Sequence, residues 1–161
     1  MTLSLARNRR AAHNIVIMTE NIVAIASDHS GLALRAELRE TIAALGFTPL
    51  DLGPETSDSV DYPDFAAKVV EAIKSGKAGQ GVLVCGTGIG MSIAANKHQG
   101  IRAALCHDVT TARLARQHNN AQILCLGARV LGVESARDCL VTFLEAEFEG
   151  GRHQRRVDKL D

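Results

Sequence analysis

The amino-acid sequence predicts an α/β fold: one doubly wound domain, Rossmann-like or flavodoxin-like, with a five-stranded parallel sheet and helices on both faces. Two observations support this prediction. Five short apolar runs typical of strands alternate with segments in which apolar residues recur at helical spacing. The chain has 161 residues, the length of a single domain, and 46% of them are hydrophobic, which suits one globular core.

Residues 1–20 differ in composition from the rest of the chain. Arg7, Arg9 and Arg10 occur there, and no acidic residue precedes Glu20. The apolar run at 15–18 is too short for a signal-peptide core or a membrane span. We therefore predict that 1–20 is a disordered extension or the product of an upstream start, with an arginine-rich organelle presequence as the alternative. The folded domain is predicted to span 21–161.

The first half of this domain is predicted to contain a strand at 22–26, a helix at 31–45, a strand at 47–52 and a helix at 63–74. Leu34, Leu38 and Ile42 share one face of the first helix, and Gly46 supplies a stop signal after it. A polar loop precedes the second helix, which begins at Pro63, a residue suited to the first helical turn.

The second half is predicted to contain a strand at 82–85, a helix that starts on the glycine turn after it, a strand at 101–106, a helix at 109–117, a strand at 122–126 and a helix at 133–148. The apolar run at 82–84 is typical of a strand buried on both faces. Leu140, Phe143 and Leu144 recur at helical spacing, so the last helix is expected to pack through them.

The glycine turn at 86–90 is the strongest candidate for a binding site. Gly86, Gly88 and Gly90 stand at every second position between the strand ending in Cys85 and the helix. Backbone N–H groups that point into the turn, together with the positive end of the helix dipole, favour binding of an oxyanion or a phosphate. The same positive partial charge favours the thiolate form of a neighbouring cysteine. The spacing matches neither a P-loop nor a dinucleotide fingerprint. The alternative is a tight strand-to-helix connection with a buried structural cysteine.

Composition excludes several classes of partner. Lysine plus arginine and aspartate plus glutamate both number 18, so no overall charge attracts nucleic acid or a membrane surface. The four cysteines show no CxxC spacing, and no paired spacing of cysteines and histidines suggests a metal site. A reducing cytoplasm is the simplest setting for these thiols.

Parallel strands bring their carboxyl ends to one edge of the sheet, where ligands of such folds bind. The residues expected there are Ser27, Asp28, His29 and Ser30 after the first strand; Cys85, Gly86 and Thr87 after the third; His107 and Asp108 after the fourth; and Gly127, Ala128 and Arg129 after the fifth.

Simpler, structural roles exist for several of the candidate residues. Asp28 or Ser30 would serve as a helix cap, and His107 with Asp108 as helix-entry residues. Likewise, His118 and Asn119 are common residue types at a helix end, and the basic tail around Arg152 and Arg156 would by default be solvated.

Six ordered motifs identify a family resemblance: SDHSG (27–31), DYPDFA (61–66), CGTGIGMSIAANK (85–97), RQHNNA (116–121), LGARV (126–130) and GGRHQRRV (150–157). With these motifs the chain resembles type B ribose-5-phosphate isomerases and the related allose-6-phosphate and galactose-6-phosphate isomerases, from residue 22 to residue 157. One branch of that family has a glutamate base at the position of Met91. This chain has Cys85 and Met91, and so it resembles the thiol branch.

The resemblance implies a role for each matching residue. Cys85 would move a proton between C1 and C2 of the sugar, while Thr87 and the turn backbone at Gly86, Gly88, Ile89 and Gly90 would hold the enediolate oxygen. His118 with Asp28 would open the sugar ring, and Asn119 and Tyr62 would line the sugar. The phosphate would meet His29, Arg129, Arg152 and Arg156. The resemblance also implies a homodimer, or a dimer of dimers, with sites at the dimer interface.

The expected activity is therefore the interconversion of ribose 5-phosphate and ribulose 5-phosphate through an enediolate, with no cofactor and no metal. Allose 6-phosphate and galactose 6-phosphate stay open as substrates, because pocket length cannot be inferred from sequence. The alternative comes from another class of protein. It is a flavodoxin-like module that binds a nucleotide or flavin and in which Cys85 is purely structural.

Overall fold

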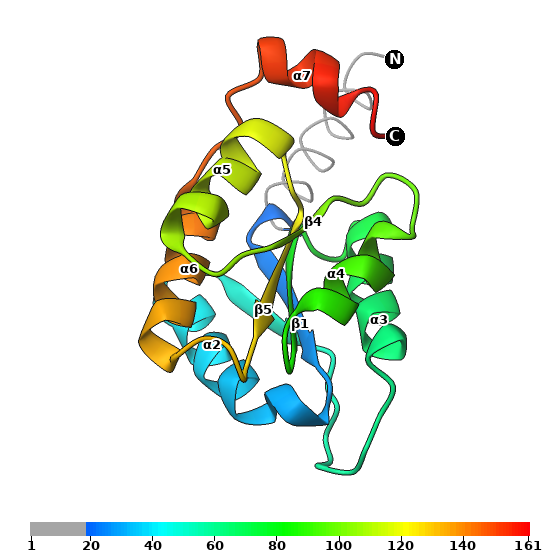
Figure 1. Ribbon diagram of the computed structural model, residues 1–161, viewed down its shortest axis with the longest axis vertical. Helices are drawn as coiled ribbons and strands as arrows, with labels where there is room; N and C mark the ends of the chain where they lie inside the picture. The colour runs from blue at the N-terminus through cyan, green and yellow to red at the C-terminus, as the bar shows by residue number, and fades with distance from the viewer. Residues whose placement is uncertain (1–18) are drawn as a thin grey trace, which may run out of the picture.

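The computed structural model describes residues 19–161. The prediction for residues 1–20 falls almost wholly outside this range. The elements in chain order are β1 (Ile22–Ser27), the short 3₁₀ helix η1 (His29–Gly31), α2 (Leu32–Ala44), β2 (Thr48–Asp51), α3 (Tyr62–Lys74), β3 (Gln80–Cys85), α4 (Ile89–Asn96), β4 (Ala103–Leu105), α5 (Val109–Asn119), β5 (Ile123–Gly127), α6 (Val133–Glu145) and α7 (Arg152–Val157) (Figure 1).

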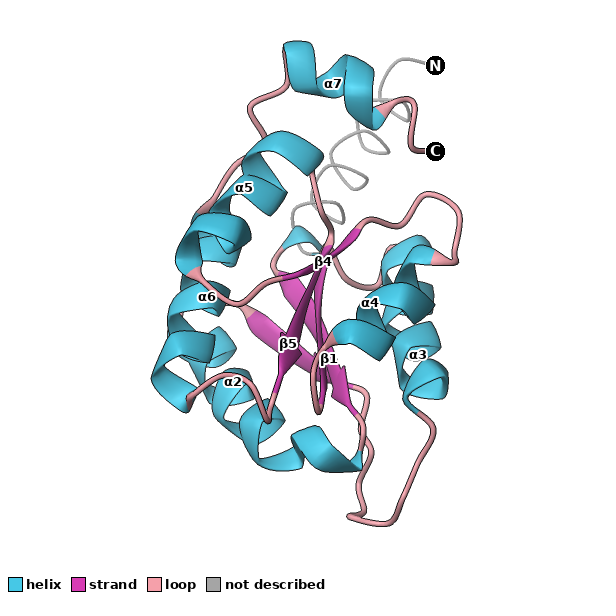
Figure 2. Ribbon diagram, viewed as in Figure 1, coloured by secondary structure: helices cyan, strands magenta, loops and turns pink. Residues whose placement is uncertain are grey.

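The five strands form one parallel sheet in the order β2-β1-β3-β5-β4, which confirms the predicted fold class. Helices α2, α5 and α6 cover one face and α3 and α4 cover the other, as Figure 2 shows. This division follows from right-handed crossovers, because connections that run in opposite directions along the sheet place their helices on opposite faces. The direction reverses between β1 and β3, so the carboxyl ends of these two strands flank a topological switch point.

The core divides into two layers by the alternation of side chains along the strands. Val82 and Val84 of β3 pack with the α2, α5 and α6 side, whereas Leu83 and Cys85 pack with the α3 and α4 side. Both sets are buried, which explains why the strand appears in the sequence as an unbroken apolar run. The same alternation places the Cys85 side chain beneath the start of α4.

The C-terminal segment differs from the prediction. Helix α6 ends at Glu145 instead of residue 148, because Ala146 has extended backbone torsions. Gly150 and Gly151 both adopt positive φ, at 63° and 52°, and turn the chain into the additional helix α7. This helix lies against the C-terminal end of α5 (Figure 1), where the His153 ring stacks on His118. His153 and Val157 are its buried residues. The basic tail is therefore a docked helix whose three arginines and Gln154 are exposed to solvent.

Candidate active site

The turn after β3 holds Cys85 at the carboxyl edge of the sheet. Its side chain is almost fully buried, and Sγ accepts a hydrogen bond from the Gly88 N–H at 3.1 Å. Gly88 has φ 77°, and a Cβ there would lie 2.6 Å from Leu105 Cδ1 and 2.9 Å from the Leu126 carbonyl carbon. Only glycine fits both the torsion and the space. Gly88 therefore fixes the direction of the thiol.

The start of α4 supplies hydrogen-bond donors beside this thiol. The Ile89 N–H donates to Thr87 Oγ1 at 3.2 Å, and the Gly88 N–H is taken by Cys85. The next two N–H groups, of Gly90 and Met91, have no acceptor within residues 19–161. Helix N-termini with such free donors attract anions. The turn thus combines a thiol with donors suited to an oxyanion, as the glycine spacing predicts.

Asp28 and His29 follow β1 on the other side of the switch point. Asp28 accepts hydrogen bonds from the Ser30 N–H at 2.9 Å and the Ser30 hydroxyl at 2.5 Å, so the predicted capping role is confirmed. Its own N–H donates to the Val84 carbonyl, which ties it to β3. His29 Nδ1 accepts from the Val60 N–H at 3.2 Å. In the neutral ring the proton is therefore on Nε2.

The loop that carries Val60 is held in place by a buried arginine of α2. Arg35 donates to Ser27 Oγ at 3.0 Å and to the Pro54 carbonyl at 2.7 Å. Its Nε lies 3.3 Å from a carboxylate oxygen of Asp51. One buried cation thereby joins the end of β1, the end of β2 and the loop that follows.

These elements enclose a pocket of about 240 Å³. Its lining comprises eight residues that the sequence predicts for the site, together with Ser30: Asp28, His29, Tyr62, Cys85, Gly86, Thr87, Gly90 and Arg129. Gly88 and Ile89 belong to the same turn without lining the pocket. The pocket lies at the switch point between β1 and β3, where ligands of doubly wound sheets bind.

Arg129 gives this pocket a positive charge. Its N–H donates to the Gly86 carbonyl at 2.9 Å, and its side chain runs past Gly86, where a Cβ would lie 3.4 Å from the guanidinium Nη1. The side chain is exposed and forms no ion pair with any residue of 19–161. Its guanidinium is therefore available to an anionic ligand such as a phosphate.

Four predicted site residues lie at the opposite end of the sheet: His118, Asn119, Arg152 and Arg156. Helix α5 runs antiparallel to the strands, so its last turn, with His118 and Asn119, lies beside α7 and away from Cys85 (Figure 1). Arg152 and Arg156 are exposed on α7. The expected pairing of His118 with Asp28 is thus not made within one chain.

His118 instead belongs to a cluster that includes two residues the sequence analysis does not select. The rings of His118 and His153 stack with centroids 4.2 Å apart and planes 9° apart. Glu149 Oε2 lies 3.5 Å from His153 Nε2 and 3.9 Å from His118 Nε2. Burial lowers the pKa of His153, and the nearby His118 lowers it further. The spacing of Glu149 and His153, four residues apart, is the only sequence signal for this contact.

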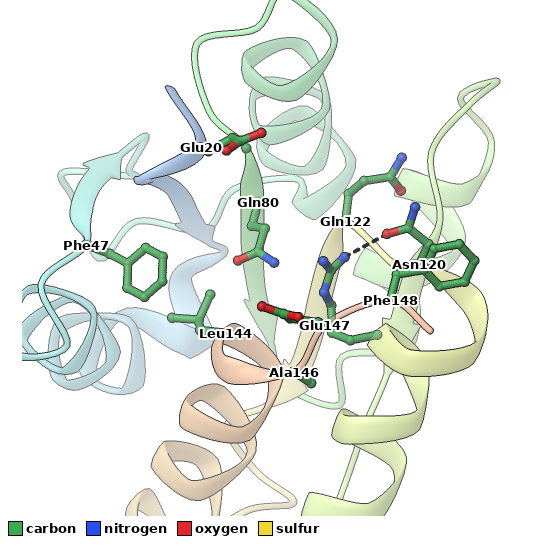
Figure 3. A pocket seen from close by; sticks show the side chains of 11 residues that line it. Glu20, Phe47, Gln80, Asn120, Gln122, Leu144, Ala146, Glu147 and Phe148 are labelled. Carbon is green, nitrogen blue, oxygen red and sulfur yellow. Dashed lines mark hydrogen bonds between the residues drawn. The ribbon is translucent and has the colours of Figure 1, made fainter. Parts of the chain in front are cut away.

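A second pocket, of about 430 Å³, lies at the amino ends of the strands (Figure 3). Arg116 lines it and donates to Asn120 Oδ1 at 3.2 Å, while its Nε is buried and has no hydrogen-bond partner among residues 19–161. Burial, with a smaller effect from Arg102, lowers the pKa of Arg116. Among the described residues, 19–161, no predicted site residue, thiol or imidazole lines this pocket. The chemistry expected from the sequence therefore belongs to the pocket at Cys85.

The fold and the Cys85 pocket define a doubly wound α/β protein with an anion-binding turn beside a thiol. No helix among residues 19–161 is long and apolar enough to cross a membrane. The sequence profile of the family described as Ribose/Galactose Isomerase matches residues 23–160, and the chain belongs to this family. The predicted family resemblance is thus confirmed.

Individual relatives span nearly the whole domain. Ribose-5-phosphate isomerase B of Escherichia coli (strain K12) is 42% identical over 138 residues, which cover 86% of this chain and 93% of that protein. D-erythrulose-4-phosphate isomerase of Pectobacterium atrosepticum is 45% identical over 139 residues, with coverages of 86% and 91%. The structure of Clostridium thermocellum ribose-5-phosphate isomerase B superposes with a TM-score of 0.85 at 50% identity, covering 86% of this chain and 94% of that chain.

Proposed function

We propose that this protein interconverts ribose 5-phosphate and ribulose 5-phosphate, with Cys85 as the base that transfers the proton. The main supporting observation is the position of Cys85, which lines a pocket at the switch point next to the first turn of α4. In that turn the N–H groups of Gly90 and Met91 have no acceptor among residues 19–161. The similarity to proteins named ribose-5-phosphate isomerase B, at 42% and 50% identity, supports the choice of substrate.

The proposed reaction is a proton transfer within the open-chain sugar. The Cys85 thiolate removes the proton from C2 of the aldose, and the electron pair moves to the carbonyl oxygen to form an enediolate. The N–H groups of Gly90 and Met91 and the Thr87 hydroxyl stabilise the negative charge on that oxygen. The O2 hydroxyl proton then passes to O1, the C2 carbonyl forms, and return of the carbon-bound proton to C1 gives the ketose. Because no electrons leave the substrate, the proposed reaction needs no redox cofactor.

The phosphate and the ring-opening step require residues from both ends of the sheet. His29 and Arg129 lie at the Cys85 pocket, whereas His118, Asn119, Arg152 and Arg156 lie at the opposite end of the same chain. A two-fold dimer would bring the α5 and α7 end of one subunit to the Cys85 pocket of the other. We therefore propose a homodimer, in which His118 opens the ring and the arginines of α7 bind phosphate across the interface.

The pentose is the proposed substrate, but sugar phosphates of other lengths need a direct comparison, because a relative named D-erythrulose-4-phosphate isomerase is 45% identical. The purified protein should be assayed with ribose 5-phosphate, D-erythrulose 4-phosphate, allose 6-phosphate and galactose 6-phosphate. We expect the highest kcat/KM with ribose 5-phosphate. A higher value with another sugar would overturn the substrate assignment, and a bound flavin or nucleotide without any turnover would favour the binding-module alternative.

The location proposed for this enzyme is the cytoplasm. All four cysteines are free and buried, which suits a reducing compartment. Fractionation of cells that express the full chain tests this proposal.

A further inference from the structure

A carboxylate not included in the proposed mechanism lies in contact with the imidazole proposed to open the ring. Glu149 Oε2 is 3.9 Å from His118 Nε2 and 3.5 Å from His153 Nε2. His153 is buried, whereas His118 and Glu149 are partly exposed. The cluster therefore has one fixed ring, one ring open to the surface and one shared acceptor.

A metal ion is one possible ligand for two imidazoles and a carboxylate, since their ligand atoms lie within 4.8 Å of one another. The ring geometry argues against it. A metal binds an imidazole nitrogen near the plane of the ring, at about 2.0 Å. The two rings are stacked with their planes only 9° apart, so one ion cannot lie in both planes. The arrangement suits a proton acceptor facing both Nε2 atoms better than a metal.

The backbone fixes this arrangement before any substrate binds. The Glu149 N–H donates to the Gln117 carbonyl at 3.0 Å, which ties Glu149 to the last turn of α5. Gly150 and Gly151 then reverse the chain with positive φ, and the His153 N–H donates to the Gly150 carbonyl at 2.9 Å. As a result, His153 returns over α5 and stacks on His118.

We propose that Glu149 is a positioning residue that orients His118 for ring opening, with the stacked His153 ring holding the imidazole plane. This inference rests on the proposed isomerase function. The negative charge of a carboxylate 3.9 Å from Nε2 favours the proton of the neutral ring on that atom and leaves Nδ1 as the proton acceptor. The oriented His118 takes the anomeric hydroxyl proton of the cyclic sugar. The C1 carbonyl then forms as the bond between C1 and the ring oxygen breaks, and His118 returns the proton to that oxygen. Glu149 itself does not touch the substrate.

The test uses Glu149→Gln, which keeps the size of the side chain and removes its charge, with Glu147→Gln as the matched control. Glu147 is an exposed carboxylate two residues away that contacts neither histidine. With ribose 5-phosphate, Glu149→Gln should lower kcat at least about tenfold, a part of the hundredfold or more that general acid–base catalysis supplies. With ribulose 5-phosphate, which has no furanose ring to open, its kcat should stay near wild type when open-chain product is trapped.

Two further measurements separate positioning from a structural role. In the His118→Ala background, Glu149→Gln should cause no additional loss, because the carboxylate acts through that ring. Nitrogen-15 shifts of His118 in the full-length protein should show the Nε2–H tautomer in wild type and in Glu147→Gln, but a mixture in Glu149→Gln. Equal losses with both substrates, or an unchanged tautomer, would overturn the proposal. The tautomer measurement needs no turnover, so it decides the role of Glu149 even if ribose 5-phosphate proves not to be the substrate.

Discussion

The Tyr62 ring packs directly over Gly90, so closely that a Cβ on Gly90 would lie 2.7 Å from Tyr62 Cζ. The contact joins the first turn of α3 to the first turn of α4, and both residues line the Cys85 pocket. Tyr62 is 40% exposed, so its ring has room to move outward. The absence of a side chain at position 90 therefore keeps the ring over the pocket.

Gly90→Ala should consequently weaken substrate binding without unfolding the protein. Alanine is favoured over glycine in a helix by about 1 kcal/mol, which offsets the cost of displacing a mobile ring. We expect KM for ribose 5-phosphate to rise roughly three- to tenfold because the ring no longer lines the sugar. The control is Gly132→Ala, where φ is −68° and no atom lies within 4 Å of the new Cβ. A normal KM in Gly90→Ala would show that Tyr62 does not bind the sugar.

Cys85→Ser should fold normally and lose isomerase activity by orders of magnitude. Serine is close in size, and its hydroxyl can still accept the hydrogen bond that Gly88 now donates to sulfur. A hydroxyl is a far weaker base than a thiolate, so proton transfer should fail with ribose 5-phosphate and with ribulose 5-phosphate alike. Circular dichroism checks the fold, and Cys106→Ser serves as the control thiol substitution. Turnover near wild type in Cys85→Ser would rule out this cysteine as the base.

Alkylation should distinguish Cys85 from the other three thiols. Burial raises the pKa of Cys106 to about 11, and it also raises the pKa values of Cys125 and Cys139. A raised pKa leaves less of the reactive thiolate at neutral pH. Iodoacetamide at pH 7.5 should therefore modify Cys85 first, and ribose 5-phosphate should slow that modification. Peptide mass spectrometry at successive times gives the order in which the four cysteines are alkylated. Modification of Cys106 before Cys85 would contradict the prediction.

The sequence was sufficient to predict the sheet, because its physical signals are local. The apolar run at 82–84 and the periodic Leu34, Leu38 and Ile42 are buried in the structure as expected. Helix α7 was missed because it is short and rich in charged residues, and only two of its six residues, His153 and Val157, are buried. Its position depends on the positive φ angles of Gly150 and Gly151, which composition alone does not determine.

The candidate site was predictable where residues follow parallel strands. Asp28, Cys85 and Arg129 lie at the carboxyl ends of three different strands, and the topology brings them to one pocket. Within a single chain His118 cannot join them, because a helix that crosses back over the sheet ends at the opposite edge. Glu149 was not predicted because it lies in an irregular segment between α6 and α7. No periodic pattern in the sequence indicates that this segment returns to His118.

Arg35→Met should destabilise the fold and loosen the loop beside the pocket. The substitution leaves Ser27 Oγ, the Pro54 carbonyl and Asp51 without the cation that now joins them. Removing one partner of a buried ion pair costs about 3 kcal/mol. Urea unfolding should show this loss, and hydrogen exchange should show faster exchange of the Val60 amide, which donates to His29.

Arg39→Met is the control, because Arg39 is largely exposed and exposed ion pairs contribute little. Equal stability of the two variants would mean that Arg35 does not hold the loop.

Mixing two inactive variants tests whether each site is shared between subunits. Cys85 and His118 lie at opposite ends of one chain, so a functional pair would require Cys85 from one subunit and His118 from its partner. Cys85→Ser and His118→Ala should each be impaired with cyclic ribose 5-phosphate.

When the two variants are unfolded together and refolded, half of the dimers contain one chain of each kind. One of the two sites in such a dimer has both native residues, so about a quarter of the wild-type activity should return in the mixture. Each variant refolded alone is the control, and sedimentation confirms the dimer. If the mixture shows no more activity than the average of its components, the active site does not combine these two residues across an interface.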